Sequence, residues 1–212
     1  MTPTDLNLKR LASATEAERR ARAAANRLAV AAADHDLLDV AVAPVDSPIG
    51  ELFVAVTPRG LACVAFEDED RDEILARLAR ELSPRILEHA PGTDEVRREL
   101  DEYFAGGRRR FELRLDRRLI HGIARDVLAA TARVPYGRTT TYGELAGKIG
   151  KPKAAWAVGN ALGSNPIPIV VPCHRVLRNG GALGGYAGGP DRKEILLEIE
   201  GVLHRTSSQR PL

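Results

Sequence analysis

The segment from Asn165 to Val176 limits the fold of this 212-residue chain more than any other part of the sequence. It reads Asn-Pro-Ile-Pro-Ile-Val-Val-Pro-Cys-His-Arg-Val, with three prolines and four β-branched residues before Cys173. Proline fixes φ and lacks a backbone N–H, and β-branched side chains restrict χ1, so this segment cannot continue a helix. We expect a stiff, extended and buried connection that delivers Cys173 and His174 to a fixed place.

The Cys-His pair at the end of this segment is a candidate for nucleophilic chemistry. A free thiol has a pKa of ~8.5 and needs a base or a positive environment to react at neutral pH. Neighbouring side chains on an extended strand point to opposite faces, so a turn or a bridging water must connect Cys173 with His174. Glu198 and Glu200 are both candidates for a carboxylate that orients the imidazole. A structural cysteine beside a polar histidine fits the pair as well.

Cys63 and Cys173 are the only cysteines. Two cysteines cannot build a disulfide framework or a four-ligand zinc site, so we expect no metal, no cofactor and a reducing cytoplasm. Cys63 lies in the apolar run Leu61–Phe66, where a buried, inert thiol is expected. No run approaches the ~18 apolar residues of a membrane helix, and no secretory signal is expected in the first thirty residues.

The first half of the chain predicts a small α+β domain over residues 39–115. Apolar alternation and turn residues favour short antiparallel strands near 40–45, 52–56 and 61–66, with a last strand at Phe111–Leu115. Two helices are expected, from the acidic patch Glu67–Asp72 to Leu82 and over Thr93–Ala105. This half shows no catalytic constellation, and residues 1–38 are expected to form an exposed helical extension.

The second half, residues 116–205, predicts a mainly helical domain, followed by a tail at 206–212. Thr141 and Glu144 form a capping-box pattern for a helix over Tyr142–Ile149, and a second helix is expected over Lys153–Leu162. Two short helices at this spacing are the outline of a helix-turn-helix, although any helical hairpin has a similar pattern. Trp156 on the second helix is either a core anchor or an exposed stacking surface.

In the second half, the charge pattern favours a polyanionic partner and the glycine pattern favours a flat ligand. Between Thr131 and Lys193 nine basic residues face only two acidic ones, which indicates a polyanionic partner. The alternative is that Arg is simply the usual basic residue of this chain, since only five of its 31 basic residues are Lys. The glycine-rich run 180–190 contains no phosphate-binding motif, so it is a wall for a flat ligand around Tyr186 or a surface connection.

Taken in order, these motifs resemble the O6-alkylguanine-DNA alkyltransferases, also called methylated-DNA–protein-cysteine methyltransferases. The resemblance covers about 160 of the 212 residues and omits only the N-terminal extension. The motifs that carry it are Ser47-Pro48-Ile49-Gly50, Val134-Pro135-Tyr136-Gly137, Thr141-Tyr142, Lys153-Ala154-Ala155, Asn165-Pro166, Pro172-Cys173-His174-Arg175-Val176, the Gly-Tyr loop, and Arg192-Lys193 through Glu200-Gly201.

The resemblance implies direct repair of duplex DNA that contains O6-alkylguanine, and it leaves open whether O4-alkylthymine is accepted. A monomer binds the minor groove, flips the damaged base, and transfers the alkyl group irreversibly to a cysteine, once per molecule. The resemblance implies that Cys173 accepts the alkyl group, that His174 deprotonates the Cys173 thiol through water, and that Glu200 orients His174. Asn165 links the recognition helix to the active-site turn, and Tyr142 helps to turn the nucleotide and bonds the flipped base.

The resemblance assigns the remaining site residues to two groups. The group expected to contact the substrate comprises Tyr142, Val176, Tyr186, Ala187, Gly188 and Lys193, with the backbone of Cys173 and Val176 reading the guanine edge. The group expected to contact DNA comprises Trp156, Lys151, Lys153, Ala154, Ala155, Gly159 and Arg175.

The sequence departs from the family pattern at two places, and the first of them, Trp156, keeps another function open. Trp156 stands where the family has an intercalating Arg, and Ile123 and Leu128 stand where it has an aromatic pair. A lesion-binding sensor that transfers nothing is therefore the main alternative, although such proteins replace the acceptor cysteine, which is present here. A cysteine hydrolase of small molecules also fits a Cys-His pair but leaves the basic helix-turn-helix unexplained.

Overall fold

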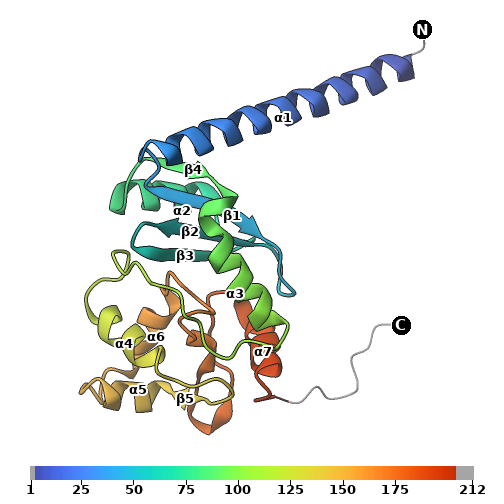
Figure 1. Cartoon of the computed structure of the whole chain (residues 1–212). Helices are drawn as coiled ribbons and strands as arrows, with labels where there is room; N and C mark the ends of the chain where they lie inside the picture. Colours follow the sequence, from blue (N-terminus) through green and yellow to red (C-terminus); the bar gives the residue numbers. More distant parts are fainter. Residues whose placement is uncertain (1–2, 204–212) are drawn as a thin grey trace.

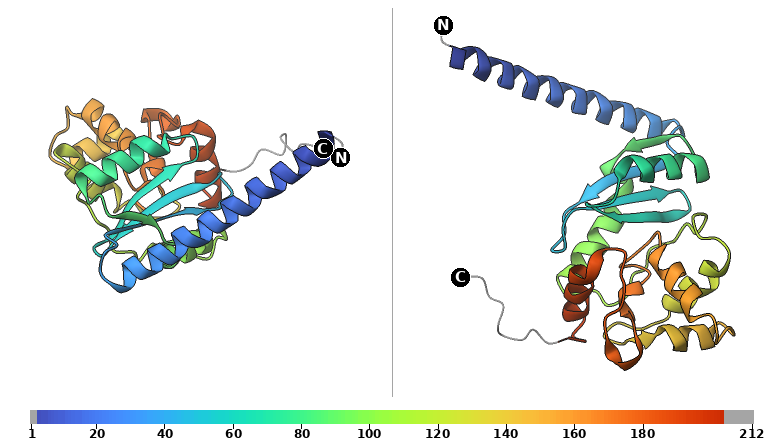
Figure 2. Two further views of the ribbon diagram at one scale, coloured as in Figure 1. Left: turned by 90° about the horizontal axis from the view of Figure 1, so that it is seen from above. Right: turned by 180° about the vertical axis from the view of Figure 1, so that it is seen from behind.

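The computed structural model describes residues 3–203, and its first helix projects away from the rest of the molecule (Figures 1 and 2). This helix, α1 (Pro3–Asp34), is the predicted N-terminal helical extension. Ala29 and Ala32 are buried near its end, whereas Leu28 and Val30 are exposed. The predicted tail at 206–212 lies outside the described residues.

The N-terminal sheet contains the three predicted antiparallel strands, β1 (Val40–Val45), β2 (Leu52–Thr57) and β3 (Gly60–Phe66). A fourth strand, β4 (Ile86–Glu88), pairs in parallel with β1 and was not predicted, since three residues, two half-buried and one exposed, carry too little pattern. The strand order is β3-β2-β1-β4.

The strand predicted at Phe111–Leu115 is wrong. This segment makes only one bridge to the sheet, at Leu61, whose N–H donates to Arg114 O at 2.8 Å. It then leaves the sheet at Asp116, whose carboxylate is held by Thr57 and Arg118. The apolar alternation therefore reflects a segment that lies against the core and does not continue the ladder.

Two helices cover this half, α2 (Arg71–Glu81) and α3 (Asp94–Phe104), the latter preceded by the 3₁₀ turn η1 (Ala90–Thr93). Asp70 caps α2 by accepting bonds from two backbone N–H groups. The apolar residues of α3 recur at helical spacing, so Val96, Leu100 and Tyr103 are buried on one face. Figure 1 shows α3 running from the sheet towards the C-terminal half.

The C-terminal half consists mainly of helices, as predicted. They are α4 (Ile123–Thr131), α5 (Tyr142–Lys148), α6 (Ala155–Gly163) and α7 (Gly189–Ile199), with short 3₁₀ turns η2 (Cys173–Arg175) and η3 (Asn179–Gly181). Two-residue strands β5 (Thr140–Thr141) and β6 (Val176–Leu177) pair in parallel and connect the helix-turn-helix to the cysteine turn.

The predicted capping box starts α5. Glu144 N–H donates to Thr141 Oγ1 at 3.2 Å, and Thr141 N–H donates to Glu144 Oε2 at 3.0 Å. α6 begins two residues later than predicted, so Lys153 precedes the helix and Ala154 is its N-cap. α5 and α6 form the predicted helix-turn-helix.

One hydrophobic core joins the two halves. It includes Phe66 and Leu100 from the first half and Leu145, Ile167 and Leu196 from the second. Val64 N–H also donates to Pro166 O at 2.8 Å, which ties β3 to the proline-rich segment. The predicted α+β fold, a small sheet domain followed by a helical domain that carries the cysteine, is confirmed. No helix within residues 3–203 is long and apolar enough to cross a membrane.

Candidate active site

The proline-rich segment is buried, as predicted, but it is not extended throughout. Val171 N–H donates to Ile167 O at 2.9 Å, which closes a tight turn, and Ile169 adopts a φ of +71° within it. A second turn, η2, carries Cys173 and His174. On an extended strand, Cys173 and His174 would point to opposite faces. In the structure both residues lie on one short helical turn.

Asn165 fixes this arrangement from the end of the helix-turn-helix. Its Nδ2 donates to Val171 O at 2.9 Å and to Cys173 Sγ at 3.2 Å, while its Oδ1 accepts from Ile167 N–H at 3.1 Å. The amide therefore holds both the turn and the thiol. The sequence-based prediction that Asn165 links the recognition helix to the cysteine turn agrees with this geometry.

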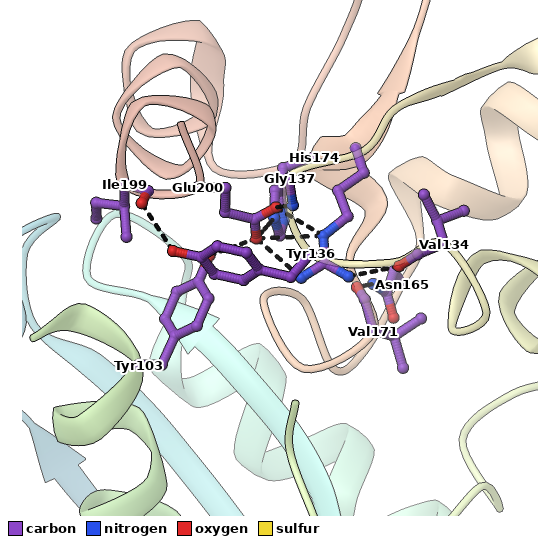
Figure 3. Close-up of polar contacts among 10 residues, drawn as sticks. Tyr103, Val134, Tyr136, Gly137, Asn165, Val171, His174, Ile199 and Glu200 are labelled. Carbon is purple, nitrogen blue, oxygen red and sulfur yellow. Dashed lines mark hydrogen bonds and ion pairs between the residues drawn. The ribbon is translucent and has the colours of Figure 1, made fainter. Parts of the chain in front are cut away.

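His174 and Glu200 form a fully buried pair, in which His174 Nε2 lies 2.9 Å from Glu200 Oε1. Of the two carboxylates left open by the sequence, Glu200 is therefore the one that contacts His174. Three further donors surround Glu200: the Arg175 guanidinium at 2.9 Å from each oxygen, Gly137 N–H at 3.2 Å and the Tyr103 hydroxyl at 2.8 Å (Figure 3).

Burial and hydrogen bonding set the charges in this site. Burial raises the pKa of Cys173 to about 11, against the opposing effects of the Asn165 amide and the Lys193 charge. Burial also lowers the pKa of His174 below its usual range. For Glu200 burial acts against the charge, but the hydrogen bonds from His174 and Arg175 outweigh it and lower the pKa to about 2. The resting site thus combines a protonated thiol, a neutral imidazole and an ionised carboxylate.

A cavity of about 550 Å³ opens between α6 and the glycine-rich loop, and Cys173 lies in its wall. Several residues that were predicted to contact substrate or DNA line the cavity. They come from α5, α6 and the loop, namely Tyr142, Ala155, Trp156, Gly159, Tyr186 and Ala187. Asn160 and Arg178 also line it and were not predicted, because neither carries a motif of its own. The Trp156 side chain is 80% exposed, which decides against the core-anchor interpretation.

Tyr186 lines this cavity and packs between the two halves. Its ring lies 5.8 Å from that of Phe66 and 6.4 Å from that of His174. Gly188 does not line the cavity; a Cβ there would lie 2.7 Å from the Phe66 ring, so the position needs glycine. The loop residues predicted to contact substrate therefore divide into cavity residues and a residue that packs on the N-terminal half.

Lys193 and Arg175 do not lie where contact with substrate or DNA requires them. Lys193 is fully buried outside the cavity, and its Nζ donates to Val176 O at 2.6 Å. Arg175 was predicted to contact DNA, but its side chain is buried against Glu200 and donates to Val134 O. A buried guanidinium paired in this way cannot reach a phosphate, so that prediction is corrected.

The other predicted DNA contacts lie along the start of α6. Lys151, Lys153 and Ala155 are exposed, whereas Ala154 and Gly159 are half-buried. Ala154, Ala155 and Gly159 are too small to block the approach of DNA to the helix. Within the described residues, no group of three or more His, Cys, Asp or Glu side chains is placed to hold a metal ion.

Family comparisons match both halves of the chain. A model described as "6-O-methylguanine DNA methyltransferase, ribonuclease-like domain" matches residues 40–117, and one described as "6-O-methylguanine DNA methyltransferase, DNA binding domain" matches residues 122–202. The chain belongs to the methylated-DNA–protein-cysteine methyltransferase family. The family resemblance predicted from the sequence is thereby confirmed.

Individual members of the methyltransferase family are similar over most of their length. The chain is 40% identical to the methylated-DNA–protein-cysteine methyltransferase of Methanosarcina acetivorans over 156 residues, which are 74% of this chain and 95% of the relative. It is 43% identical to that of Mycolicibacterium paratuberculosis over 74% and 89% of the two chains.

Solved structures show the same fold. The crystal structure of Mycobacterium tuberculosis O6-methylguanine methyltransferase matches with a TM-score of 0.66 and 36% identity over 80% of this chain and 96% of that one. The M. tuberculosis protein in complex with DNA matches with a TM-score of 0.65 at 36% identity, over 77% and 92% of the two chains.

Proposed function

We propose that this methyltransferase-family protein repairs O6-alkylguanine in duplex DNA by moving the alkyl group to Cys173. The observation that carries the proposal is the placement of Cys173 in the cavity wall, with Asn165 on its sulfur and the His174–Glu200 pair on the same turn. A thiol, a neutral base and an orienting carboxylate are the parts that nucleophilic transfer needs.

The buried site implies an order for the chemistry. His174 Nδ1 is buried without a hydrogen-bond partner among the described protein atoms, so it can accept the Cys173 proton, through water, while Nε2 stays bonded to ionised Glu200. The thiolate attacks the alkyl carbon, the C–S bond forms as the C–O6 bond breaks, and guanine leaves as an anion that takes up a proton. Because the thioether has no comparable leaving group, each molecule acts once.

Base flipping supplies the access that this mechanism needs. We place the minor groove along α6, where Lys151 and Lys153 face the phosphates and small residues allow close approach. The exposed Trp156 fills the gap left by the flipped base by stacking, in place of the family's Arg. Tyr142, whose ring would lie 3.8 Å from a Cβ on Gly159 and whose hydroxyl donates to Gly185 O at 3.4 Å, lies between this helix and the loop that encloses the base.

The protein acts as a monomer in a reducing compartment such as the cytoplasm. The reducing compartment follows from the chemistry, because Cys173 must remain a free thiol to react. Repair of O4-alkylthymine in the same cavity is a question for the same assay with that lesion.

Intact-mass measurement tests this proposal directly. The protein is mixed with a duplex containing one O6-methylguanine, and the modified residue is located by peptide mapping. We expect the mass of one methyl group on Cys173, with none in Cys173→Ala and none with undamaged DNA. Lesion-selective binding without a mass change would instead identify a damage sensor, and steady turnover of a small ester would identify a hydrolase.

A further inference from the structure

The N-terminal half contributes a hydroxyl group to the carboxylate that contacts His174. Tyr103 on α3 is fully buried, and its O–H donates to Glu200 Oε1 at 2.8 Å across 97 residues of sequence (Figure 3). No pattern in the sequence predicts this contact, because the first half shows no catalytic constellation. No other hydroxyl among the described residues bonds to Glu200.

Tyr103 shares its acceptor atom with the proposed base. Glu200 Oε1 also lies 2.9 Å from His174 Nε2 and 2.9 Å from Arg175 Nη2. Each donor partly neutralises the negative charge of the same oxygen. The Tyr103 hydroxyl therefore reduces the electrostatic attraction between Glu200 and a proton on His174. It also holds the carboxylate from α3, an element of the other half of the chain than the cysteine turn.

The Tyr103 ring is held rigidly enough to impose this geometry. Its centroid lies 5.3 Å from those of Phe104 and Phe111 and 6.2 Å from that of Tyr136. Packed aromatic rings have little rotamer freedom, so the hydroxyl cannot swing away from Glu200. Burial raises the pKa of Tyr103 above its usual range, which keeps the group a donor at all working pH values.

We propose that Tyr103 is a positioning residue of the alkyl-transfer reaction: the N-terminal half uses its hydroxyl to aim Glu200 at His174 and to limit how strongly Glu200 attracts a proton to the imidazole. The inference rests on the proposed function of Cys173, His174 and Glu200. It gives the sheet domain a part in the chemistry, in addition to packing.

Several charged or titratable groups face the His174–Glu200 pair, and those that act on the charge of His174 are Glu200, Arg175 and Lys193. The groups that face the pair are Tyr103 on α3, Tyr136 after α4, Cys173 and Arg175 on η2, Tyr186 on the glycine-rich loop and Lys193 on α7. Arg175 and Lys193 oppose protonation of His174, and Glu200 favours it. Removal of the Tyr103 hydroxyl leaves more negative charge on Glu200, so the pKa of His174 rises.

Tyr103→Phe in the full chain tests the inference, because it deletes one oxygen and keeps the ring. We measure single-turnover methyl transfer at saturating protein from pH 5.5 to 9.5. The rate is expected to fall about tenfold, and its acidic limb to move to higher pH, since His174 must be neutral to act. Affinity for the lesion duplex, measured in a Cys173→Ala background, is expected to stay within about twofold.

Tyr136→Phe is the matched control. It removes a hydroxyl from the same aromatic cluster, but that hydroxyl donates to Ile199 O at 2.7 Å and not to a carboxylate. A merely structural hydroxyl changes stability without moving the pH limb, so this variant should keep the wild-type profile. The inference is overturned if Tyr103→Phe also keeps that profile.

Iodoacetamide alkylates a reactive cysteine in the absence of DNA, and mass mapping then locates the label. This experiment separates failure of the inference from failure of the proposed function. Wild-type protein that alkylates at Cys173 but takes no methyl group from DNA would refute the function only. An unchanged pH dependence of alkylation in Tyr103→Phe would refute the role of Tyr103, whatever the DNA assay shows.

Discussion

The two cysteines lie in two regions that bury them almost equally and prepare them differently. Cys63 on β3 is 7% exposed and Cys173 on η2 is 4% exposed. Burial raises the pKa of both thiols, to about 12 for Cys63 and about 11 for Cys173. Burial therefore does not distinguish a reactive cysteine from an inert one in this fold.

The surroundings make the difference. Cys63 lies in a regular strand among apolar side chains, and no hydrogen bond to its sulfur is found in the described part of the chain. Cys173 has the Asn165 amide on its sulfur, the Lys193 charge within electrostatic range, and a base on the same turn. A thiol that is protonated at rest can react only where a neighbouring group removes its proton.

The largest effect on this contrast is expected from Glu200→Gln. The change removes the charge that orients His174 and leaves Arg175 buried without its ion-pair partner. We expect the transfer rate to fall by about 10²- to 10⁴-fold and the free energy of unfolding at pH 7 to fall by about 3–5 kcal/mol. Single-turnover rates and denaturant unfolding check this, with Glu198→Gln as the control that leaves the His174 contact in place.

The same variant makes a pH prediction. The pKa of Glu200 lies near 2 in the folded protein against 4.5 for a free carboxyl group, so its stabilising effect is complete above pH 4.5 and is lost as the pH falls towards 2. Roughly 3 kcal/mol of the stability difference between wild type and variant should disappear over that interval. A difference that stays constant from pH 7 to pH 2 would contradict the assignment of the charge to Glu200.

A smaller effect is expected from Trp156→Ala, which tests whether Trp156, beside the cavity that contains Cys173, contacts the DNA. Loss of one stacking contact should weaken binding of a lesion duplex by about 1–3 kcal/mol, or roughly 5- to 150-fold. Fluorescence anisotropy in a Cys173→Ala background measures this at fixed salt. Leu28→Ala, which removes another exposed apolar side chain, is the control and should leave the affinity unchanged.

Trp156→Arg sharpens the same measurement. A guanidinium at this position should steepen the dependence of log affinity on log salt by about one, while lesion binding is retained. Equal affinity for the Trp, Ala and Arg forms would show that this side chain does not enter the DNA.

The smallest effect is expected from Cys63→Ala. With no base or amide on its sulfur, Cys63 contributes packing only, so the transfer rate should stay within about twofold and the unfolding free energy should fall by about 1 kcal/mol. Native alkylation followed by mass mapping should label Cys173 before Cys63. Labelling in the reverse order would mean that exposure, and not the neighbouring groups, controls reactivity.

The sequence predicted what local patterns control. Strands β1 to β3 follow from apolar alternation, the start of α5 from the Thr141–Glu144 capping box, and the site motif from the order Asn165, Cys173, His174. It failed where a pattern was short or ambiguous, as for β4 and for the segment 111–115, because pairing there depends on what lies beside the strand.

Only the tertiary structure decided which distant groups meet. The choice of Glu200 over Glu198, the burial of Arg175 and the exposure of Trp156 depend on how α7, η2 and α6 pack. The contact of Tyr103 with Glu200 joins residues that no local pattern relates. The sequence thus determined most of the elements, the family and the cysteine of the site. The charge and orientation of the groups around that thiol were decided by packing, because desolvation and hydrogen bonding act between residues that are neighbours only in space.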